Sequence, residues 1–311
     1  MNKKTLIILL GIFIILGAAS TYSWWGQYFN FNNKKPFSNS GLNFSTFTKK
    51  TTEKIYITKS GEEEKIIEKK SGVWKVNGFD ASQEEIDDFF VVLPGLVVES
   101  LVSKNPKNHK NFGVAEENGI HLALTQNGAE TTFIIGNSAA TFNSFYIKIK
   151  GSNNVYKMSG MLRYKLTMSV AAWRDKTIIR IPKQAIQKIE VVSNTKPLIL
   201  AKNEGSWIAE RLGKTSHLDE TTLNSLFSSI NPLKASGFLN EQEQKEFQDA
   251  SKQTAIRIFG NNQAIIAEIT MLKKENEWWA AKVNEQDGFY KIPSYKLSNI
   301  FLTDEEIFEE K

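Results

Sequence analysis

Residues 82–101 read SQEEIDDFFVVLPGLVVESL and residues 219–238 read DETTLNSLFSSINPLKASGF, which align at one offset of 137 (219 minus 82). Each stretch begins with a residue that commonly caps helices, Ser82 or Asp219. Glu85, three residues after Ser82, completes a predicted capping box. Apolar residues follow with the spacing i, i+3, i+4 and i+7; in the first stretch they are Ile86, Phe89, Phe90 and Leu93. This spacing predicts a helix with one buried face in each stretch.

Further matches occur on both sides of these helices, in the same order and at nearly the same offset. The aligned segments are 54–57 with 188–191, 72–74 with 205–207, 155–157 with 289–291, and 164–166 with 295–297. Self-similarity at a fixed period is the sequence signature of repeated modules. We therefore predict two tandem repeats of one module, residues 47–182 and residues 183–311.

Short segments of alternating apolar residues, separated by Gly, Asn and Ser, surround each predicted helix and are typical of antiparallel strands with tight turns. The predicted strands are 54–58, 65–69, 73–76, 120–124, 131–136, 145–150 and 155–158 in the first repeat, and 189–192, 198–201, 255–259, 264–272, 278–283 and 288–292 in the second. The fold class is therefore α+β. We expect an N-terminal transmembrane helix followed by two antiparallel-sheet modules with one principal helix each.

The N-terminus carries two lysines, Lys3 and Lys4, and then an apolar run from residue 5 to residue 19. Extended to residue 22, this run is near the lower length limit of a membrane span. The lysines favour the cytoplasmic side, which predicts a membrane anchor in residues 1–25. The predicted anchor and interface residues are Leu6, Ile7, Ile8, Leu9, Leu10, Ile12, Phe13, Ile14, Ile15, Leu16, Tyr22, Trp24 and Trp25.

A cleaved signal peptide is the alternative, because the small residues at 17–20 could form a cleavage site. We favour the uncleaved anchor, since cleavage would leave Trp24 and Trp25 near a new, solvent-exposed N-terminus. Both interpretations place the body outside the cytoplasm, and the first predicts a single-pass protein of the bacterial cytoplasmic membrane. Residues 26–46 are rich in Asn and Ser, which predicts a tether.

Composition excludes several functional classes. The 311 residues include no cysteine, so disulfides, thiolate metal sites and cysteine nucleophiles are excluded. The net charge of +5 includes four lysines in residues 1–46, and the charges that follow are mixed in sign. Nucleic-acid binding would concentrate basic residues on one face, so we expect no such partner. Phosphate-binding and dinucleotide motifs do not occur in the sequence, so we expect no cofactor.

Candidate catalytic groups are few and poorly spaced. His109, His121 and His217 lie far apart and are expected on the surface, so no metal site is predicted. Asp87 and Asp88 are neighbours on the predicted helix, where they point about 100° apart and form a solvated face rather than an acid–base pair. Residues 193–196 spell S-x-x-K, but in a predicted turn rather than a helix. We expect no catalytic residue.

The charged cluster Trp173, Arg174 and Asp175 lies between the two repeats and has no counterpart in the second. Arg and Trp dominate the energetics of protein interfaces, which makes this cluster a candidate partner-docking site. The alternative is an Arg–Asp pair that fixes the connection between the repeats, with Trp173 in the core. In the pair Trp278-Trp279, strand periodicity places the two rings on opposite faces.

Several motifs, in addition to the predicted anchor, are similar to those of one bacterial family. They are GVW at 72–74, NFGV at 111–114, TFIIG at 132–136, VY at 155–156 and WRDK at 173–176. The chain resembles the family called domain of unknown function 4340 over most of residues 47–182 and, more weakly, in the second half. Residues 115–117 read AEE where the family usually has a proline. The resemblance implies a membrane-anchored extracytoplasmic protein encoded with an ABC-type exporter similar to the gliding-motility auxiliary components, and it supplies no catalytic residues.

From these observations we expect a non-enzymatic, single-pass accessory protein of a membrane complex, an ABC-type exporter in particular. Its partners would be the lipid bilayer and an integral membrane protein complex of the permease kind. The alternatives are an envelope hydrolase, with carboxylates that converge only in three dimensions, and a glycan- or solute-binding module that acts on surface polymers.

Overall fold

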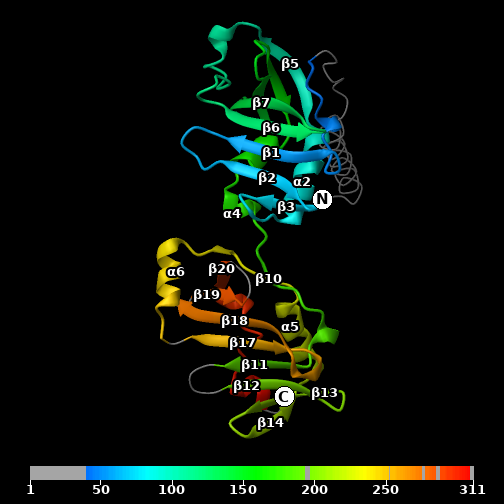
Figure 1. The fold of residues 1–311 in the computed structure, drawn as a ribbon, viewed down its shortest axis with the longest axis vertical. Helices are drawn as coiled ribbons and strands as arrows, with labels where there is room; N and C mark the ends of the chain where they lie inside the picture. Colours follow the sequence, from blue (N-terminus) through cyan, green and yellow to red (C-terminus); the bar gives the residue numbers. More distant parts are fainter. Residues whose placement is uncertain (1–39, 193–196, 252, 275–276, 285–287, 309–311) are drawn as a thin grey trace, which may run out of the picture. The chain divides into compact units, whose positions relative to one another are not determined.

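The computed structural model describes residues 40–192, 197–251, 253–274, 277–284 and 288–308 (Figure 1). The predicted membrane anchor in residues 1–25 and the S-x-x-K sequence at 193–196 lie outside these residues. Within the described ranges, none of the helices has the length and apolar composition of a membrane span.

The predicted tether, residues 26–46, extends into the described part of the chain, and there it is packed. Leu42 and Phe44 are buried. The rings of Phe44 and Phe133 are 4.5 Å apart between centroids. The folded body therefore begins before residue 47, where the sequence placed its start.

The chain divides into a first unit that ends at Val170 and a second unit that begins at Ala171. The sequence placed this division after residue 182. The difference follows from β10 (Thr177–Ile179), which pairs with β15 (Leu233–Lys234) in a small sheet of the second unit. Residues before 183 therefore belong to the second unit.

The first unit is built on a nine-stranded antiparallel sheet with the order β4-β3-β2-β1-β6-β7-β8-β9-β5 (Figure 1). Its strands are β1 (Thr52–Thr58), β2 (Lys65–Lys70), β3 (Val73–Val76), β4 (Phe79–Asp80), β5 (Val97–Ser103), β6 (Ile120–Gln126), β7 (Ala129–Ser138), β8 (Ser144–Ile149) and β9 (Val155–Ser159). All seven strands predicted for the first repeat are present. The sequence did not predict β4 and β5, which form the two edges of the sheet.

The second unit contains another nine-stranded antiparallel sheet, with the order β14-β13-β12-β11-β17-β18-β19-β20-β16. Its strands are β11 (Lys188–Val192), β12 (Leu198–Asn203), β13 (Ser206–Arg211), β14 (Lys214–His217), β16 (Gly237–Phe238), β17 (Thr254–Phe259), β18 (Ile265–Lys274), β19 (Trp278–Val283) and β20 (Phe289–Pro293). Taken in chain order, the strands of the two sheets occupy the same places. The predicted α+β class, with antiparallel sheets and few helices, is confirmed.

Two-residue turns set the register of the outer hairpins in both sheets. The pairs Ser71-Gly72 and Asn77-Gly78 follow β2 and β3, and both residues of each pair have positive φ. In the second unit Glu204-Gly205 and Leu212-Gly213 follow β12 and β13 in the same conformation. Two successive positive φ angles are typical of the turns whose twist matches that of antiparallel hairpins. A glycine at the second place makes this backbone accessible without a steric cost.

One principal helix packs on each sheet, as the repeated stretch predicts. In α2 (Gln83–Val92) the Ser82 side chain accepts the Glu85 backbone N–H at 3.3 Å. In α5 (Glu220–Ile230) the Asp219 carboxylate accepts the Thr222 backbone N–H at 2.9 Å. Both predicted caps are therefore confirmed. The predicted capping box is not, because the Glu85 carboxylate accepts a hydrogen bond from Lys165.

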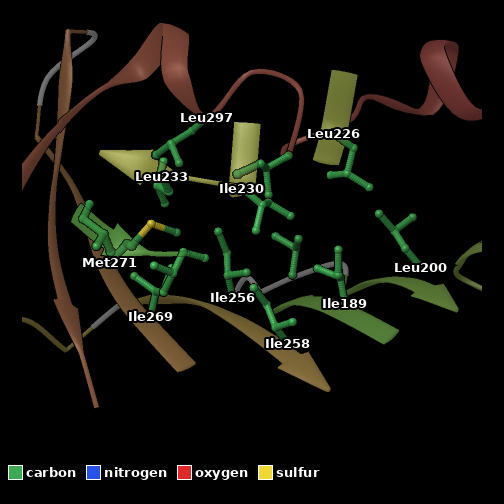
Figure 2. Packing of buried hydrophobic residues seen from close by; sticks show 14 of the residues in the cluster. Ile189, Leu200, Leu226, Ile230, Leu233, Ile256, Ile258, Ile269, Met271 and Leu297 are labelled. Atoms are coloured by element: carbon green, nitrogen blue, oxygen red, sulfur yellow. The ribbon is translucent and has the colours of Figure 1, made fainter. Parts of the chain in front are cut away.

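The cores lie between each sheet and its helix. Figure 2 shows the second unit, where Leu226 and Ile230 of α5 face the sheet residues Ile189, Ile256 and Ile258. All five side chains are at most 1% exposed. Burial of one such side chain contributes about 1.5–3 kcal/mol, so this layer accounts for much of the stability of the unit.

The opposite face of the first sheet is covered by the connection from β5 to β6, residues 104–119. Val114 of this connection packs on Ile134 and Val155. The connection lies close to β7 because each segment has a glycine at the contact, Gly113 in the connection and Gly136 in β7. A Cβ on Gly136 would lie 2.1 Å from the Phe112 carbonyl oxygen. The IIG motif thus ends in glycine because the backbone of the NFGV motif occupies the place of a side chain.

In the second unit the corresponding connection, from β16 to β17, forms a helix, α6 (Glu241–Gln248), which the sequence did not predict. Phe247 of α6 packs with Leu239 and Ala280 on the outer face of the sheet. The helix begins with a capping box between Asn240 and Glu243. A loop and a helix thus cover the same region of the two sheets.

We expect Gly136→Ala to lower the free energy of unfolding by about 3 kcal/mol, because the new methyl group overlaps the Phe112 carbonyl oxygen, which cannot move without the loop that carries it. Gly95→Ala is the control, since nothing lies within 4 Å of its Cβ position. Urea denaturation of the two variants measures the difference. Equal stabilities would show that the 111–114 loop does not hold its place against β7.

The environment of Glu243 predicts that the stability of the second unit depends on pH. Burial raises the pKa of this carboxyl, but hydrogen bonds from Lys291 Nζ and the Asn240 backbone N–H outweigh burial and hold it below its usual 4.5. The ionised form therefore stabilises the fold above about pH 4.5, and this contribution is lost as the pH falls through the lower folded-state pKa. Between pH 6 and pH 3, denaturation should show a smaller loss of stability in Glu243→Gln than in the wild type. Glu241→Gln, on the exposed side of the same helix, should keep the wild-type loss.

Candidate functional site

A pocket of about 460 Å³ opens in the first unit where the β7–β8 connection meets the chain after β9. Its volume is within the range of sites that bind small molecules or single side chains of a partner. The lining residues come from two segments and are Ser138, Ala139, Ala140, Thr141, Phe142, Asn143, Ser144, Phe145, Gly160, Met161, Arg163, Tyr164 and Thr167.

Three of the lining residues are large, apolar or aromatic, and exposed. Phe142 is 89% exposed, Tyr164 is 62% exposed and Met161 is 45% exposed. We call these three residues the rim of the pocket. Single exposed apolar side chains are common on protein surfaces, whereas a group of them beside one pocket is typical of an interaction site.

A backbone hydrogen bond joins the two segments of the pocket: the Gly160 N–H donates to the Asn143 carbonyl at 2.9 Å. Within the first segment, the Ala139 N–H donates to the Ser144 carbonyl at 2.7 Å and closes the turn. Gly160 has a φ of +136°, and a Cβ there would lie 2.5 Å from the Leu96 side chain. The close approach of Leu96 therefore requires glycine at this turn.

Arg163 is the one charged residue in the pocket lining. Its Nε donates to the Gly136 carbonyl oxygen at 3.1 Å, which fixes the guanidinium against the end of β7. Among the described residues, its two terminal nitrogens have no hydrogen-bond partner. Arg163 is thus a positively charged group in the pocket lining, and its hydrogen bond to a neutral carbonyl holds it in place.

The helix that carries Arg163 and Tyr164, α3 (Leu162–Thr167), is fixed by Lys165. Lys165 Nζ donates to Glu85 at 2.6 Å and to Asp88 at 3.2 Å, both on α2. Burial lowers the pKa of Lys165, but these hydrogen bonds and the charge of the two carboxylates outweigh burial and raise it above 10.5. The ion pair is therefore intact at neutral pH and locks α3 to α2.

Asp87 and Asp88 lie on the exposed face of α2, as the sequence predicts, with side chains 57% and 60% exposed. Asp87 forms an ion pair with Lys49, and Asp88 forms one with Lys165. The two neighbouring carboxylates thus serve different partners, as their angular separation on the helix requires. This arrangement keeps the carboxylates apart.

One of the three histidines is not on the surface, which corrects the prediction. His109 is only 9% exposed, and its Nε2 lies 3.1 Å from the Asn153 carbonyl oxygen. His121 on β6 is partly buried, with Nε2 2.7 Å from the Glu116 carbonyl oxygen. His217 is exposed. Within the described ranges, no group of three or more His, Asp or Glu side chains could hold a metal ion.

The predicted docking cluster is spread over different environments. Trp173 is fully buried, in α4 (Val170–Trp173). The guanidinium of Arg174 lies 3.6 Å from the ring centroid of Phe238, and burial there lowers the pKa of Arg174. Asp175 accepts the Thr177 backbone N–H at 2.9 Å. Docking at this cluster stays a prediction, in which Arg174 and Asp175 rather than the buried indole would meet a partner.

The neighbouring Trp278 and Trp279 are both partly buried. Trp279 stacks on Phe301, with centroids 4.9 Å apart, and packs against the main core. Trp278 packs against the smaller cluster of Leu239 and Phe247. The two rings thus lie on opposite faces of β19, as the strand periodicity predicts.

No sequence motif marks the pocket. Its residues lie in the 138–145 and 160–167 segments, which contain no spaced motif. One signal was present: the aligned triplets at 164–166 and 295–297 begin with tyrosine. Tyr164 and Tyr295 are both exposed, at 62% and 73%, whereas Leu166 and Leu297 are buried. A tyrosine that is solvent-exposed at both aligned positions is a candidate contact residue.

We expect Glu85→Gln to destabilise the first unit by about 2 kcal/mol, because Lys165, whose side chain is 9% exposed, loses its nearest carboxylate. Asp88→Asn should cost less than about 0.5 kcal/mol, because the Asp88 side chain is 60% exposed and water screens the pair. Thermal and urea denaturation of both variants measure the difference. A larger loss in Asp88→Asn would contradict the assigned roles.

The family model described as "Domain of unknown function (DUF4340)" matches residues 73–252, which is more than half of the 311 residues. The match begins at β3 of the first unit and ends just before β17 of the second. The match covers much of the 47–182 range and part of the second half, where the sequence motifs indicate a weaker resemblance. Comparison with curated proteins and with solved structures finds no match. The chain belongs to the family described as domain of unknown function DUF4340.

Proposed function

We propose that this protein is a non-enzymatic accessory subunit of a membrane complex, and that it binds a partner protein through the rim of the pocket. Residues 1–25 would hold it in the cytoplasmic membrane as a single-pass anchor, with the folded body on the extracytoplasmic side. The partner that we propose is an ABC-type exporter of the gliding-motility kind, on the basis of the family resemblance.

The exposed rim is the observation that carries this proposal. Phe142, Met161 and Tyr164 lie beside one pocket, on segments that backbone hydrogen bonds hold in place. Aromatic residues and methionine are enriched in protein interfaces, where they supply contact area at a low cost in conformational entropy. A pre-formed aromatic rim is therefore suited to contact with a partner surface.

The same proposal treats the two units as copies of one module. Supporting this, Trp74 of β3 and Phe90 of α2 have ring centroids 5.8 Å apart, and Trp207 of β13 and Phe227 of α5 have centroids 5.3 Å apart. These pairs align in the repeat.

A membrane anchor would favour partner binding even where the contact itself is weak. Confinement beside an integral membrane partner raises the effective concentration of the body, so weak binding at the rim can still keep most of the partner bound. This explains how a binding surface of three large side chains could suffice in the full-length protein.

We expect the double variant Phe142→Ala/Tyr164→Ala to reduce recovery of the partner about tenfold, the effect of losing roughly 1.4 kcal/mol of binding free energy. The measurement is crosslinking of the tagged full-length protein in intact membranes, followed by quantitative mass spectrometry of the transporter subunits. Val91→Ala is the control, because Val91 is 72% exposed on α2 and does not line the pocket.

Undiminished crosslinking of the double variant would overturn the role of the rim. Recovery of the wild-type protein without transporter subunits, with its N-terminal segment intact, would overturn the proposed accessory function itself.

A further inference from the structure

The ion pairs described for the first unit join side chains of that unit to one another. Lys165 binds Glu85 and Asp88, Lys157 binds Glu99, and Lys49 binds Asp87. Arg163 differs from these cations because its described contact is a neutral carbonyl, at Gly136. It is also the charged residue of the pocket lining. No carboxylate of the described residues forms an ion pair with Arg163, so its positive charge is available to a ligand in the pocket.

The geometry of that contact leaves the outer end of the guanidinium available. Nε is used by Gly136, whereas the two terminal nitrogens carry N–H groups without an acceptor in the described part of the chain. A planar carboxylate can accept two parallel hydrogen bonds from this end of an arginine. Because Nε already fixes the plane of the group, less conformational entropy is lost when the carboxylate binds.

The lining also favours a singly charged acceptor. It provides one cation and several neutral hydroxyl groups, and two of these hydroxyls are already used: Ser144 Oγ donates to Glu99, and Thr167 Oγ1 donates to the Tyr164 carbonyl. A carboxylate has the one negative charge that Arg163 balances. A phosphate dianion would leave about one negative charge uncompensated in the pocket.

The rim favours a protein as the source of this carboxylate. A small molecule in the pocket would leave most of Phe142 in water, since that side chain is 89% exposed. A protein surface with an apolar residue next to its acid can cover Phe142 and Tyr164 while the acid reaches Arg163. Such a pairing of aromatic anchors with one arginine is typical of interface hot spots.

We propose that the pocket binds an acidic side chain, Asp or Glu, of the partner protein, with the carboxylate on the Arg163 guanidinium and an adjacent apolar residue on the rim. This inference rests on the proposed function for the identity of the partner as a protein, and it adds the chemistry by which the partner is recognised.

Fluorescein-labelled peptides test the pocket directly. The probes are acetyl-Phe-Glu-Phe-amide and acetyl-Phe-Gln-Phe-amide extended by a labelled lysine, titrated with the full-length protein in detergent and followed by fluorescence anisotropy. The wild type should bind the Glu peptide about tenfold more tightly than the Gln peptide, the expected gain from a charge-assisted pair. Arg163→Gln should bind both peptides equally.

Lys150→Gln is the matched control, because it removes one exposed positive charge of the same unit outside the pocket. It should keep the wild-type preference for the Glu peptide. Circular dichroism and thermal denaturation test whether Arg163→Gln is folded. Arg163→Lys, which keeps the charge but lacks the planar guanidinium, should show an intermediate preference for the Glu peptide.

Several outcomes would overturn the inference. They are equal binding of the two peptides to the wild type, no binding of either, a preference that survives Arg163→Gln, and stronger competition by oligogalacturonate or inorganic phosphate than by the Glu peptide. The membrane crosslinking experiment separates this failure from that of the proposed function. Arg163→Gln could keep the transporter crosslinks while Phe142→Ala/Tyr164→Ala loses them. That outcome would support the accessory function and contradict the carboxylate site.

Discussion

The contact between an indole of the sheet and a phenylalanine of the helix holds each unit together. Trp74 is 1% exposed and Trp207 is 6% exposed, each beneath the helix that crosses its sheet. Burial of about 200 Å² of such a ring contributes about 5 kcal/mol. In the described residues Trp74 Nε1 has no hydrogen-bond partner, which costs about 1–3 kcal/mol. Burial exceeds this cost, so the helix position, and with it α3 and the pocket, depends on this contact.

The second face of each sheet shows that one structural requirement can be met in two ways. The loop of residues 104–119 covers it in the first unit, and α6 covers it in the second. The loop depends on glycines such as Gly136, because backbone lies directly against backbone. The helix instead fills the space against its sheet with Phe247. The apolar residues on this face must therefore be buried, but either a loop or a helix can bury them.

Much of the fold could be predicted because it depends on local signals: glycine turns, helix caps and alternating strands. The missed elements lack a periodic run of apolar residues, even though α6 begins with a capping box and β4 follows the Asn77-Gly78 turn. The register of β5 shifts between Val98 and Ser100 and again between Leu101 and Ser103, so its apolar residues do not alternate. The α6 sequence EQEQKEFQ buries only Phe247. The pocket forms where segments 138–145 and 160–167 meet, and the exposure of Phe142 is set by tertiary structure, so the aligned tyrosines alone could not reveal it.

Two sheets of the same strand order in one chain carry a risk of misassembly, since a strand of one could pair at the edge of the other during folding. The edges described above reduce that risk. β4 and β16 contain only two residues each, too few to serve as a template for a long partner. The longer edge strand β5 is irregular at two places, and such bulges twist an edge away from regular pairing. The irregular strand that obscured the sequence pattern thus protects the chain from strand exchange and aggregation.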